Sequence, residues 1–276
     1  MITAGIDVGS VAAKCILVDV STRRIAGRAV LPSGWNAREA GEKALLGALR
    51  EAGKERNDVQ YIVGTGYGRV SLPFADKSVT EISCHARGAA HLFPATGVVL
   101  DIGGQDSKVI RLDAGDNSKG GGRVSDFIMN DKCAAGTGRF LQVLSGILGL
   151  TLEELGQAAS RGKPAAISSM CAVFAETEIV GLLAKGEAPE NIAAGVFLSI
   201  VRRTCSLARR IPVQGECTFA GGLALSPAFS SMLSVELGVP VNVPEDPQTM
   251  GALGAALIAS DMASAAQSSR GSSTFA

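Results

Sequence analysis

The feature that most constrains this chain is an internal repeat of a short strand, an Asp-x-Gly turn and a second strand. The two copies are Gly5–Lys14 (GIDVGSVAAK) and Leu100–Lys108 (LDIGGQDSK). Each copy places a lysine seven positions after its aspartate, Asp7 in the first and Asp101 in the second, and continues into an apolar run. A repeated supersecondary unit predicts two similar lobes, which divide near Pro94–Gly97.

Short apolar segments that alternate with helical patterns indicate an α/β protein. The expected strands are Ala4–Val8, Cys15–Val20, Ile25–Leu31, Val59–Val63, Val98–Ile102, Lys108–Leu112, Arg123–Met129, Cys217–Ala220 and Val241–Val243. The expected helices are Ala37–Ala52, Glu81–Leu92, Thr137–Leu148, Leu152–Ser160, Phe174–Ala184, Asn191–Arg210 and Met250–Ser260. We expect an N-terminal lobe over residues 1–95 and a C-terminal lobe over residues 96–260 whose last helix crosses back. The Ser/Ala/Gln-rich residues 261–276 are expected to form a disordered tail.

Composition narrows the class of protein. Lys+Arg and Asp+Glu both number 26, so no broad basic field is available for nucleic acid or an anionic membrane. The N-terminus MITAGIDVGS lacks a basic region followed by an apolar stretch, and no run approaches the roughly 20 apolar residues that span a bilayer. We therefore expect a cytoplasmic protein, in which six cysteines are not a disulfide framework.

The two Asp-x-Gly turns have the chemistry of phosphate loops. A carboxylate at the end of a buried strand can hold Mg²⁺ through water, and glycines let phosphate approach backbone N–H groups. Lys14 can add a point charge. One such turn alone is equally consistent with an ordinary hairpin, but two copies with matched offsets favour nucleotide binding. The P-loop motif is absent, and Gly64–Gly68 (GTGYG) has the wrong glycine spacing for a dinucleotide site and is interpreted as a strand-to-loop turn.

The segments GIDVGS, LDIGGQDSK and FAGG (Phe219–Gly222) resemble the two phosphate motifs and the adenosine motif of the superfamily of actin, hexokinases and heat-shock chaperones. The resemblance implies an actin-like/hexokinase-like ATPase fold with ATP and Mg²⁺ in a cleft between two similar lobes. The implied catalytic residues are Asp7, Asp101 and Gln105. The implied nucleotide-binding residues are Gly9, Ser10, Lys14, Gly103, Gly104, Gly221 and Gly222.

Two cysteine-containing segments carry a second signal. They are MNDKCAAGTGRFL (Met129–Leu141) and ISSMCAVFAETEI (Ile167–Ile179), and each places a cysteine just before a predicted helix. A helix N-terminus lowers a thiol pKa, which suits Cys133 and Cys171 to metal ligation. Spacing alone leaves open that both are small buried hydrophobic residues, like the other four cysteines. Two cysteines cannot saturate a four-ligand cluster, whereas a two-fold dimer supplies four thiolates.

Together with the phosphate motifs, these segments closely resemble the BadF/BadG/BcrA/BcrD ATPase family from about residue 4 to 260. The nearest group is the activator, or component A, of 2-hydroxyacyl-CoA dehydratases. The resemblance implies that Cys133 and Cys171 of each subunit ligate one [4Fe-4S] cluster per homodimer. It also implies that ATP hydrolysis drives an electron, received from ferredoxin or flavodoxin, into a dehydratase at low potential.

Two alternatives remain at this stage. The first is an ATPase subunit of benzoyl-CoA reductase, although some such subunits have a degraded second phosphate motif and GGQD is intact here. The second is a small-molecule kinase of the same fold without a cluster, for which the sequence reveals neither a catalytic base nor a substrate pocket. The acyl-CoA enzyme that accepts the electron is left open.

Overall fold

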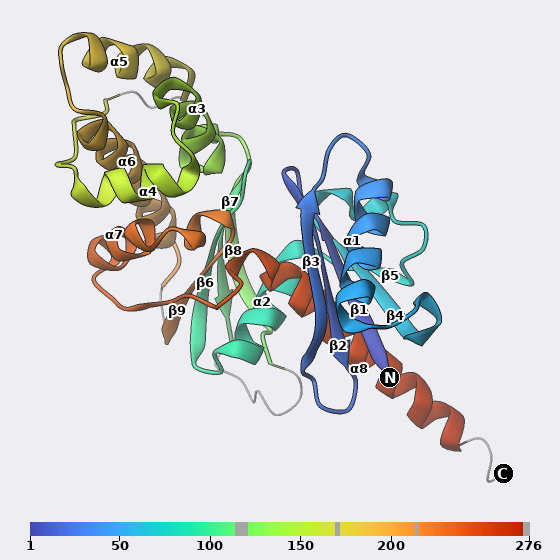
Figure 1. The fold of residues 1–276 in the computed structure, drawn as a ribbon. Helices are drawn as coiled ribbons and strands as arrows, with labels where there is room; N and C mark the ends of the chain where they lie inside the picture. Colours follow the sequence, from blue (N-terminus) through green and yellow to red (C-terminus); the bar gives the residue numbers. More distant parts are fainter. Residues whose placement is uncertain (114–120, 169–171, 213–214, 273–276) are drawn as a thin grey trace. The chain divides into compact units, whose positions relative to one another are not determined.

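The computed structural model describes residues 1–113, 121–168, 172–212 and 215–272. The chain divides into two units (Figure 1). Unit 1 comprises Met1–Ala95, Leu112–Val124 and Gln248–Ala276, and unit 2 comprises Thr96–Arg111 and Ser125–Pro247. The C-terminal part of the chain therefore belongs to the same unit as the N-terminus.

The sheet of unit 1 has five strands among the described residues, in the order β3-β2-β1-β4-β5. They are β1 (Ile2–Val8), β2 (Ala12–Asp19), β3 (Ile25–Pro32), β4 (Val59–Thr65) and β5 (Lys77–Ser78). The first three strands form an antiparallel meander, and β4 pairs in parallel with β1. Parallel pairing requires a crossover, which a helix between β3 and β4 provides.

The sheet of unit 2 repeats this arrangement. Over the described part of the chain its order is β8-β7-β6-β9-β10, with β6 antiparallel to β7 and parallel to β9. The strands are β6 (Thr96–Ile102), β7 (Ser107–Leu112), β8 (Val124–Asn130), β9 (Glu216–Ala220) and β10 (Val241–Asn242). The matching strand order confirms the two-lobed α/β fold that the sequence repeat predicts.

Eight α-helices accompany the two sheets in the described residues. Unit 1 contains α1 (Ala37–Ala52), α2 (Glu81–Leu92) and α8 (Met250–Ser272). Unit 2 contains α3 (Gly138–Leu148), α4 (Leu152–Arg161), α5 (Ala172–Ala184), α6 (Pro189–Ala208) and α7 (Pro227–Leu237). Short 3₁₀ helices are η1 (Arg56–Asp58), η2 (Tyr67–Ser71), η4 (Ala134–Gly136), η5 (Gly222–Leu225) and η6 (Pro247–Thr249). The bounds of α1 and α2 are those that the sequence predicts.

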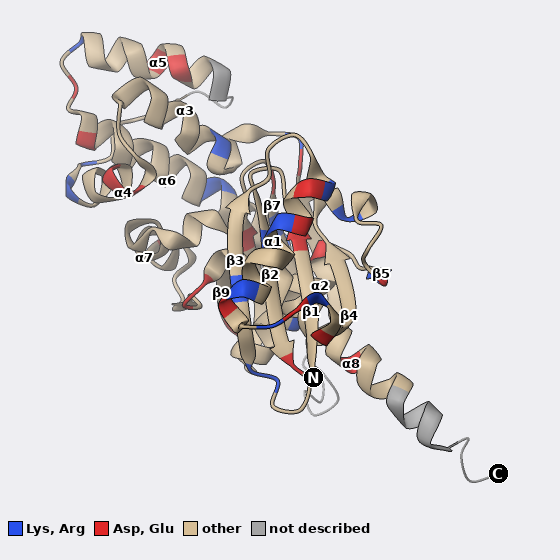
Figure 2. Cartoon of the chain, turned by 45° about the vertical axis from the view of Figure 1, so that its right-hand side comes forward, with Lys and Arg blue, Asp and Glu red and all other residues tan. Residues whose placement is uncertain are grey.

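Both faces of the unit 1 sheet are covered by helices. Side chains alternate along a strand, so Ala13, Cys15 and Leu17 of β2 pack with α1, whereas Ile16 and Val18 pack with α8. Burial on both faces explains why β1 and β2 read as nearly continuous apolar runs. The solvent side of α1 carries oppositely charged side chains next to each other (Figure 2). Unit 1 is therefore a three-layer α/β/α structure.

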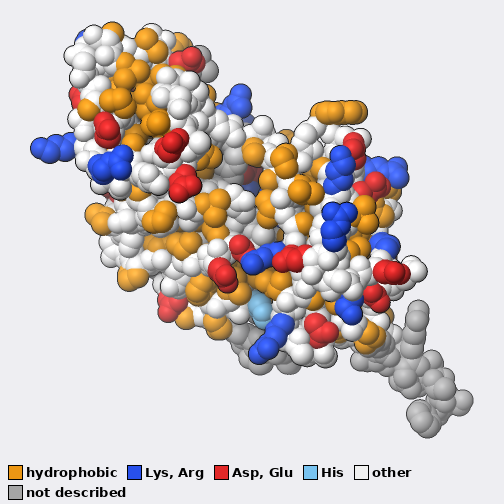
Figure 3. All heavy atoms as spheres, in the orientation of Figure 1, with side chains coloured by type: hydrophobic (Ala, Val, Ile, Leu, Met, Phe, Trp, Pro, Cys, Tyr) orange, Lys and Arg blue, Asp and Glu red, His pale blue; other side chains and the backbone are white. Residues whose placement is uncertain are grey.

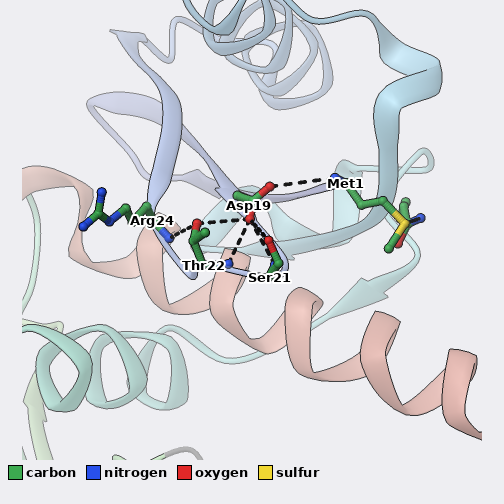
Figure 4. Close-up of polar contacts among 6 residues, drawn as sticks. Met1, Asp19, Ser21, Thr22 and Arg24 are labelled. Atoms are coloured by element: carbon green, nitrogen blue, oxygen red, sulfur yellow. Dashed lines mark hydrogen bonds and ion pairs between the residues drawn. The ribbon is translucent and has the colours of Figure 1, made fainter.

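A short hairpin turn joins β2 to β3 and is organised by one carboxylate (Figure 4). The Asp19 Oδ1 accepts hydrogen bonds from the Ser21 N–H at 3.0 Å and the Thr22 N–H at 2.9 Å, and from both hydroxyls. These hydrogen bonds lower the pKa of Asp19 well below its ordinary value, and the bond from the Ser21 hydroxyl contributes most. The turn allows the antiparallel meander to continue directly from the strand that carries Lys14.

Unit 2 has one large apolar core between its sheet and its helices. The aromatic rings of Phe197, Phe219 and Phe229 meet there, with ring centroids 5.8 and 5.6 Å apart. Hydrophobic side chains also reach the surface of the helical part of this unit (Figure 3), among them Phe174 and Val180 of α5. The core thus fixes the sheet and α6, while α5 presents apolar side chains to solvent.

The last helix is longer than the sequence predicts. We expected it to end near Ser260 and a disordered tail to follow, but α8 continues to Ser272. The Asp261 carboxylate lies 2.6 Å from Arg23 and 3.4 Å from Arg87, so ion pairs hold the helix where the apolar pattern fades. Alanine in this segment also favours helix. The expectation of disorder from residue 261 onwards was therefore wrong for the described residues.

α8 is a core helix of unit 1. It is the one helix in the described residues that is long and apolar enough to cross a membrane, and 67% of that window is buried inside the protein. Small residues make this burial possible. A Cβ built on Gly254 would lie 1.7 Å from the Cys84 carbonyl oxygen of α2, and one built on Gly5 would lie 2.0 Å from the Ala252 carbonyl oxygen.

This packing predicts the effect of adding one methyl group. Gly254→Ala should lower the free energy of unfolding by about 3 kcal/mol, because backbone atoms of α2 and α8 must separate. Gly146→Ala in α3 is the control, since a Cβ there meets nothing within 4 Å. It should change stability by no more than about 1 kcal/mol. Urea unfolding followed by circular dichroism measures both, and equal midpoints for the two variants would contradict the close packing.

Candidate functional site

The first candidate phosphate loop lies between β1 and β2. Asp7 is near the carboxyl end of β1, and the antiparallel register places Lys14 opposite it. The Lys14 Nζ lies 3.2 Å from the Asp7 Oδ2, and the Asp7 side chain is buried. The Gly9 N–H closes the turn by donating to the Ala12 carbonyl at 3.0 Å, and Ser10 in the turn is exposed. The pair with Lys14 offsets the cost of burying a carboxylate at this position.

The second candidate phosphate loop lies between β6 and β7 and has the same construction. Lys108 stands opposite Asp101, with its Nζ 3.2 Å from the Asp101 Oδ2. The Gly103 N–H donates to the Asp106 carbonyl at 2.9 Å, and Gln105 is exposed in the turn. The Lys108 Nζ also lies 2.8 Å from the Asp106 Oδ2. One buried ammonium group therefore fixes two carboxylates.

The two loops differ in charge and in the exposure of their lysines. Asp106 occupies the position that Ala12 has in the first loop, five residues after the respective aspartate. The side chain of Lys14 is 16% exposed and meets one carboxylate, whereas that of Lys108 is 2% exposed and meets two. Lys14 thus remains accessible to an anion, whereas the Lys108 ammonium group is enclosed by its two carboxylates. Sequence reasoning missed Asp106, whose signal is its place inside the second repeat.

A glycine from the neighbouring parallel strand abuts each aspartate. Gly66 follows β4 and has φ 86°, and Gly221 follows β9 and has φ 88°. A Cβ on Gly66 would lie 2.4 Å from the Asp7 Oδ1, and one on Gly221 would lie 2.7 Å from the Asp101 Oδ1. Any side chain would displace the carboxylate, and a positive φ disfavours one as well. Gly66 lies in the strand-to-loop turn that the sequence predicts, and it also borders the first phosphate loop.

The residues of the adenosine motif lie in unit 2. Gly221 ends β9 and donates its N–H to the Pro247 carbonyl at 2.9 Å, and Gly222 begins η5. Leu223 of η5 approaches the start of α3, where a Cβ on Gly138 would lie 3.1 Å from the Leu223 Cδ1. The second phosphate loop, the adenosine motif and the start of α3 are therefore neighbours within one unit.

The donor set of the first loop fits a hydrated Mg²⁺ ion. The Asp7 Oδ2 is paired with Lys14, but the buried Asp7 Oδ1 has no hydrogen-bond partner among the described residues. A buried carboxylate oxygen without a partner calls for a missing ligand. Mg²⁺ keeps several of its waters and takes few protein carboxylates, so a metal-bound water is a suitable partner for this oxygen.

Cys133 is the one free cysteine in the described residues that is only partly buried. It lies between β8 and η4, and the Asn130 side chain holds its backbone on both sides. The Asn130 Oδ1 accepts from the Cys133 N–H at 3.1 Å, and the Asn130 Nδ2 donates to the Cys133 carbonyl at 3.0 Å. Cys133 precedes the predicted helix as expected: it is the N-cap residue of η4, and Thr137 then caps α3.

The other described cysteines are unsuited to ligation. Cys15, Cys84, Cys205 and Cys217 are buried. Burial raises the pKa of Cys84 and Cys217 to about 12 and that of Cys205 to about 11, and it raises the pKa of Cys15 still further. A thiol that resists deprotonation is a poor metal ligand.

The cysteine donor set fits a cluster as far as the structure describes it. Cys133 has the exposure that a ligand needs, and Cys171 lies outside the described residues. Within the described residues, no group of three or more His, Cys, Asp or Glu side chains could hold a metal ion by itself.

Comparison with known proteins identifies the family of this chain. The chain matches the BadF/BadG/BcrA/BcrD ATPase family over residues 4–259. It is 41% identical over 264 residues to the activator of lactoyl-CoA dehydratase from Anaerotignum propionicum, covering 95% of this chain and 99% of that protein. It is 34% identical over 267 residues to a benzoyl-CoA reductase subunit from Thauera aromatica, covering 93% of this chain and 92% of that protein.

The structure resembles solved structures of both near and distant proteins. The activator of the 2-hydroxyisocaproyl-CoA dehydratase from Clostridium difficile, with ADPNP bound, superposes with a TM-score of 0.90 at 39% identity and covers 98% of each chain. A ROK hexokinase from Thermus thermophilus, at 16% identity and a TM-score of 0.52 over 96% of this chain and all of that one, shares the fold alone. On the family match and these identities, the chain belongs to the BadF/BadG/BcrA/BcrD ATPase family.

Proposed function

We propose that this protein is an ATP-hydrolysing activator that injects a low-potential electron into a 2-hydroxyacyl-CoA dehydratase. The observation that carries the proposal is the pair of matched Asp–Lys phosphate loops, in a chain 41% identical to the activator of lactoyl-CoA dehydratase over almost its whole length. The activator with ADPNP bound has the same fold as this chain, which supports nucleotide binding here.

The two phosphate loops would bind phosphate and Mg²⁺ for ATP hydrolysis. Gly9 and Gly103 close the turns with their own N–H groups and, having no side chain, let phosphate approach the backbone. The N–H group of Gly104 binds phosphate oxygens, and the accessible Lys14 ammonium adds charge. Asp7 and Asp101 hold Mg²⁺ through water. Ser10 adds an exposed hydroxyl to the loop of unit 1, and within unit 2 Gly221 and Gly222 border the adenosine.

One further role follows from exposure and charge. Gln105 is exposed in a turn that also carries Asp101 and Asp106, so its amide can orient the attacking water. Preorganised polar groups of this kind stabilise charge that develops as the phosphate bond breaks. The products are ADP and inorganic phosphate, and the water proton leaves to solvent.

The electron carrier of this proposal is one [4Fe-4S] cluster per homodimer, held by Cys133 and Cys171 of both protomers. When bound, the cluster supplies one-electron chemistry at low potential. The chain's own contribution is the half-buried thiol of Cys133 on a loop that Asn130 fixes. Ferredoxin or flavodoxin is the proposed donor, and the cytoplasm is the proposed compartment.

The alternatives have weaker support. The chain is less similar to the benzoyl-CoA reductase subunit than to the lactoyl-CoA dehydratase activator, and its second phosphate loop keeps the Asp101–Lys108 pair. The kinase hypothesis is supported only by fold, at 16% identity to a hexokinase. An activator of a dehydratase is therefore the function that the sequence and geometry support best.

Removal of either metal-organising carboxylate should separate hydrolysis from cluster binding. Asp7→Asn and Asp101→Asn keep the side-chain volume, and each should lower the ATP hydrolysis rate roughly 10- to 100-fold through loss of metal affinity. The cluster absorbance should stay unchanged. Asp113→Asn, at an exposed carboxylate paired with Arg123, is the control and should hydrolyse ATP at the normal rate. Normal hydrolysis in both loop variants would overturn the assignment of the loops.

Iron analysis tests the cysteine ligands. Anaerobically purified protein should contain about four irons per two chains, as one [4Fe-4S] cluster requires. Cys133→Ala or Cys171→Ala should abolish bound iron, because each removes two of the four thiolates of a dimer. Cys205→Ala and Cys84→Ala change buried thiols and should keep the iron. The ligand assignment fails if either of the first two variants retains full iron content.

A further inference from the structure

The start of α3 is hydrogen-bonded to the second phosphate loop. The Gly138 N–H donates to the Gly103 carbonyl, and the Arg139 N–H donates to the Gly104 carbonyl, both at 2.9 Å. These are the first two residues of α3, whose N–H groups have no partner inside the helix. The phosphate loop thus supplies backbone acceptors to the helix start, and the Thr137 hydroxyl also accepts from the Arg139 N–H at 3.3 Å.

The contact is close because position 138 is glycine. A Cβ on Gly138 would lie 3.2 Å from the Gly103 carbonyl oxygen and 3.5 Å from the Gly104 Cα, and it would also crowd Leu223. A larger residue would push the loop and the helix apart. The junction therefore has little room to absorb a displacement of the loop.

Peptide geometry makes this contact sensitive to an anion. In a planar trans peptide, the C=O and N–H groups point in opposite directions and rotate together. The carbonyl of Gly103 is rigidly linked to the N–H of Gly104, and the carbonyl of Gly104 to the N–H of Gln105. An anion that draws these N–H groups toward itself rotates both carbonyls, and α3 must follow them or lose its hydrogen bonds.

A continuous set of short-range bonds joins the start of α3 to Cys133. The Thr137 hydroxyl and N–H both donate to the Ala134 carbonyl, at 2.9 and 3.1 Å. The Gly136 N–H donates to the Cys133 carbonyl at 3.4 Å, and the Asn130 side chain holds the Cys133 backbone from the other side. Residues 133–138 thus form one hydrogen-bonded segment between the phosphate loop and the thiol.

We propose that Asn130 and Thr137 are positioning residues that couple the occupancy of the second phosphate loop to the Cys133 thiol, entirely within unit 2. The proposal rests on the proposed function, because it takes the occupant of the loop to be a nucleotide phosphate. It goes beyond that function by naming the route through which the ATP site acts on the cluster ligand.

The test uses full-length, cluster-free protein and measures alkylation of Cys133. Iodoacetamide modification of the Cys133 peptide is timed by mass spectrometry with saturating Mg-ADP and with a saturating non-hydrolysable ATP analogue, after calorimetry has confirmed that each nucleotide binds. The wild-type rates should differ about fivefold or more between the two nucleotides, which is a typical size for site-to-site coupling. The buried cysteines 15, 84, 205 and 217 should stay unmodified and report that the fold is intact.

Asn130→Ala removes the clamp on Cys133 and should bring the ratio of the two rates close to one, with nucleotide affinity unchanged. Thr137→Val keeps the shape of the side chain, removes the hydroxyl's bonds to the Ala134 carbonyl and the Arg139 N–H, and should reduce the ratio as well. The matched control is Asn191→Ala. Asn191 also makes two side-chain bonds in unit 2, at 2.7 Å to Lys163 N–H and 2.7 Å to Glu187, but lies outside residues 130–139. It should keep the wild-type ratio.

Three outcomes would overturn the coupling while leaving the ATPase assignment standing. They are equal wild-type rates with both nucleotides bound, a wild-type ratio in Asn130→Ala, and loss of the ratio in Asn191→Ala, which would indicate general loosening. Failure of the wild-type protein to bind either nucleotide would contradict the proposed function and the coupling together.

Discussion

The buried ion pair between an aspartate at the end of one strand and a lysine on its antiparallel neighbour is the contact on which the site depends. It occurs as Asp7–Lys14 in unit 1 and as Asp101–Lys108 in unit 2, each at 3.2 Å. The ion pair holds the aspartate carboxylate beside the turn that follows its strand. Backbone N–H groups are exposed in this turn. Because the bare carboxylate would be costly to bury, the lysine is required for the loop to exist in this form.

The surrounding residues hold each ion pair in place and make the two phosphate loops differ in charge and exposure. A left-handed glycine from the neighbouring parallel strand, Gly66 or Gly221, leaves just enough space for the carboxylate. Asp106 then makes the second loop acidic, whereas the first loop retains an accessible Lys14. One repeated supersecondary unit thus yields two phosphate loops that differ in charge, and the second is hydrogen-bonded to the helix that follows Cys133.

Features set by residues close together in the sequence were predicted, whereas contacts between segments far apart in the chain were missed. The Asp–Lys offset and the alternation of strands with helices revealed the repeat and the two-lobed α/β architecture, and the resemblance of the phosphate and cysteine segments revealed the family. The place of Gly66 beside the first phosphate loop and the contact of Gly138 with the second depend on pairing between segments far apart in the chain. A fixed spacing in the sequence cannot reveal such pairing. Cys133 precedes α3 as the sequence predicts, but the 3₁₀ helix η4 between them was not predicted. The helical extension of α8 past residue 260 relies on Asp261 ion pairs that composition does not reveal.

The central claim is that ATP hydrolysis at these loops drives an electron from the protein into a dehydratase. The most direct measurement follows the visible absorbance of anaerobically reduced protein mixed with the 2-hydroxyacyl-CoA dehydratase of the same cell. With Mg-ATP, the absorbance should report rapid oxidation by one electron per dimer; with a non-hydrolysable analogue, the protein should stay reduced. Oxidation at the same rate with either nucleotide, or with none, would contradict the account.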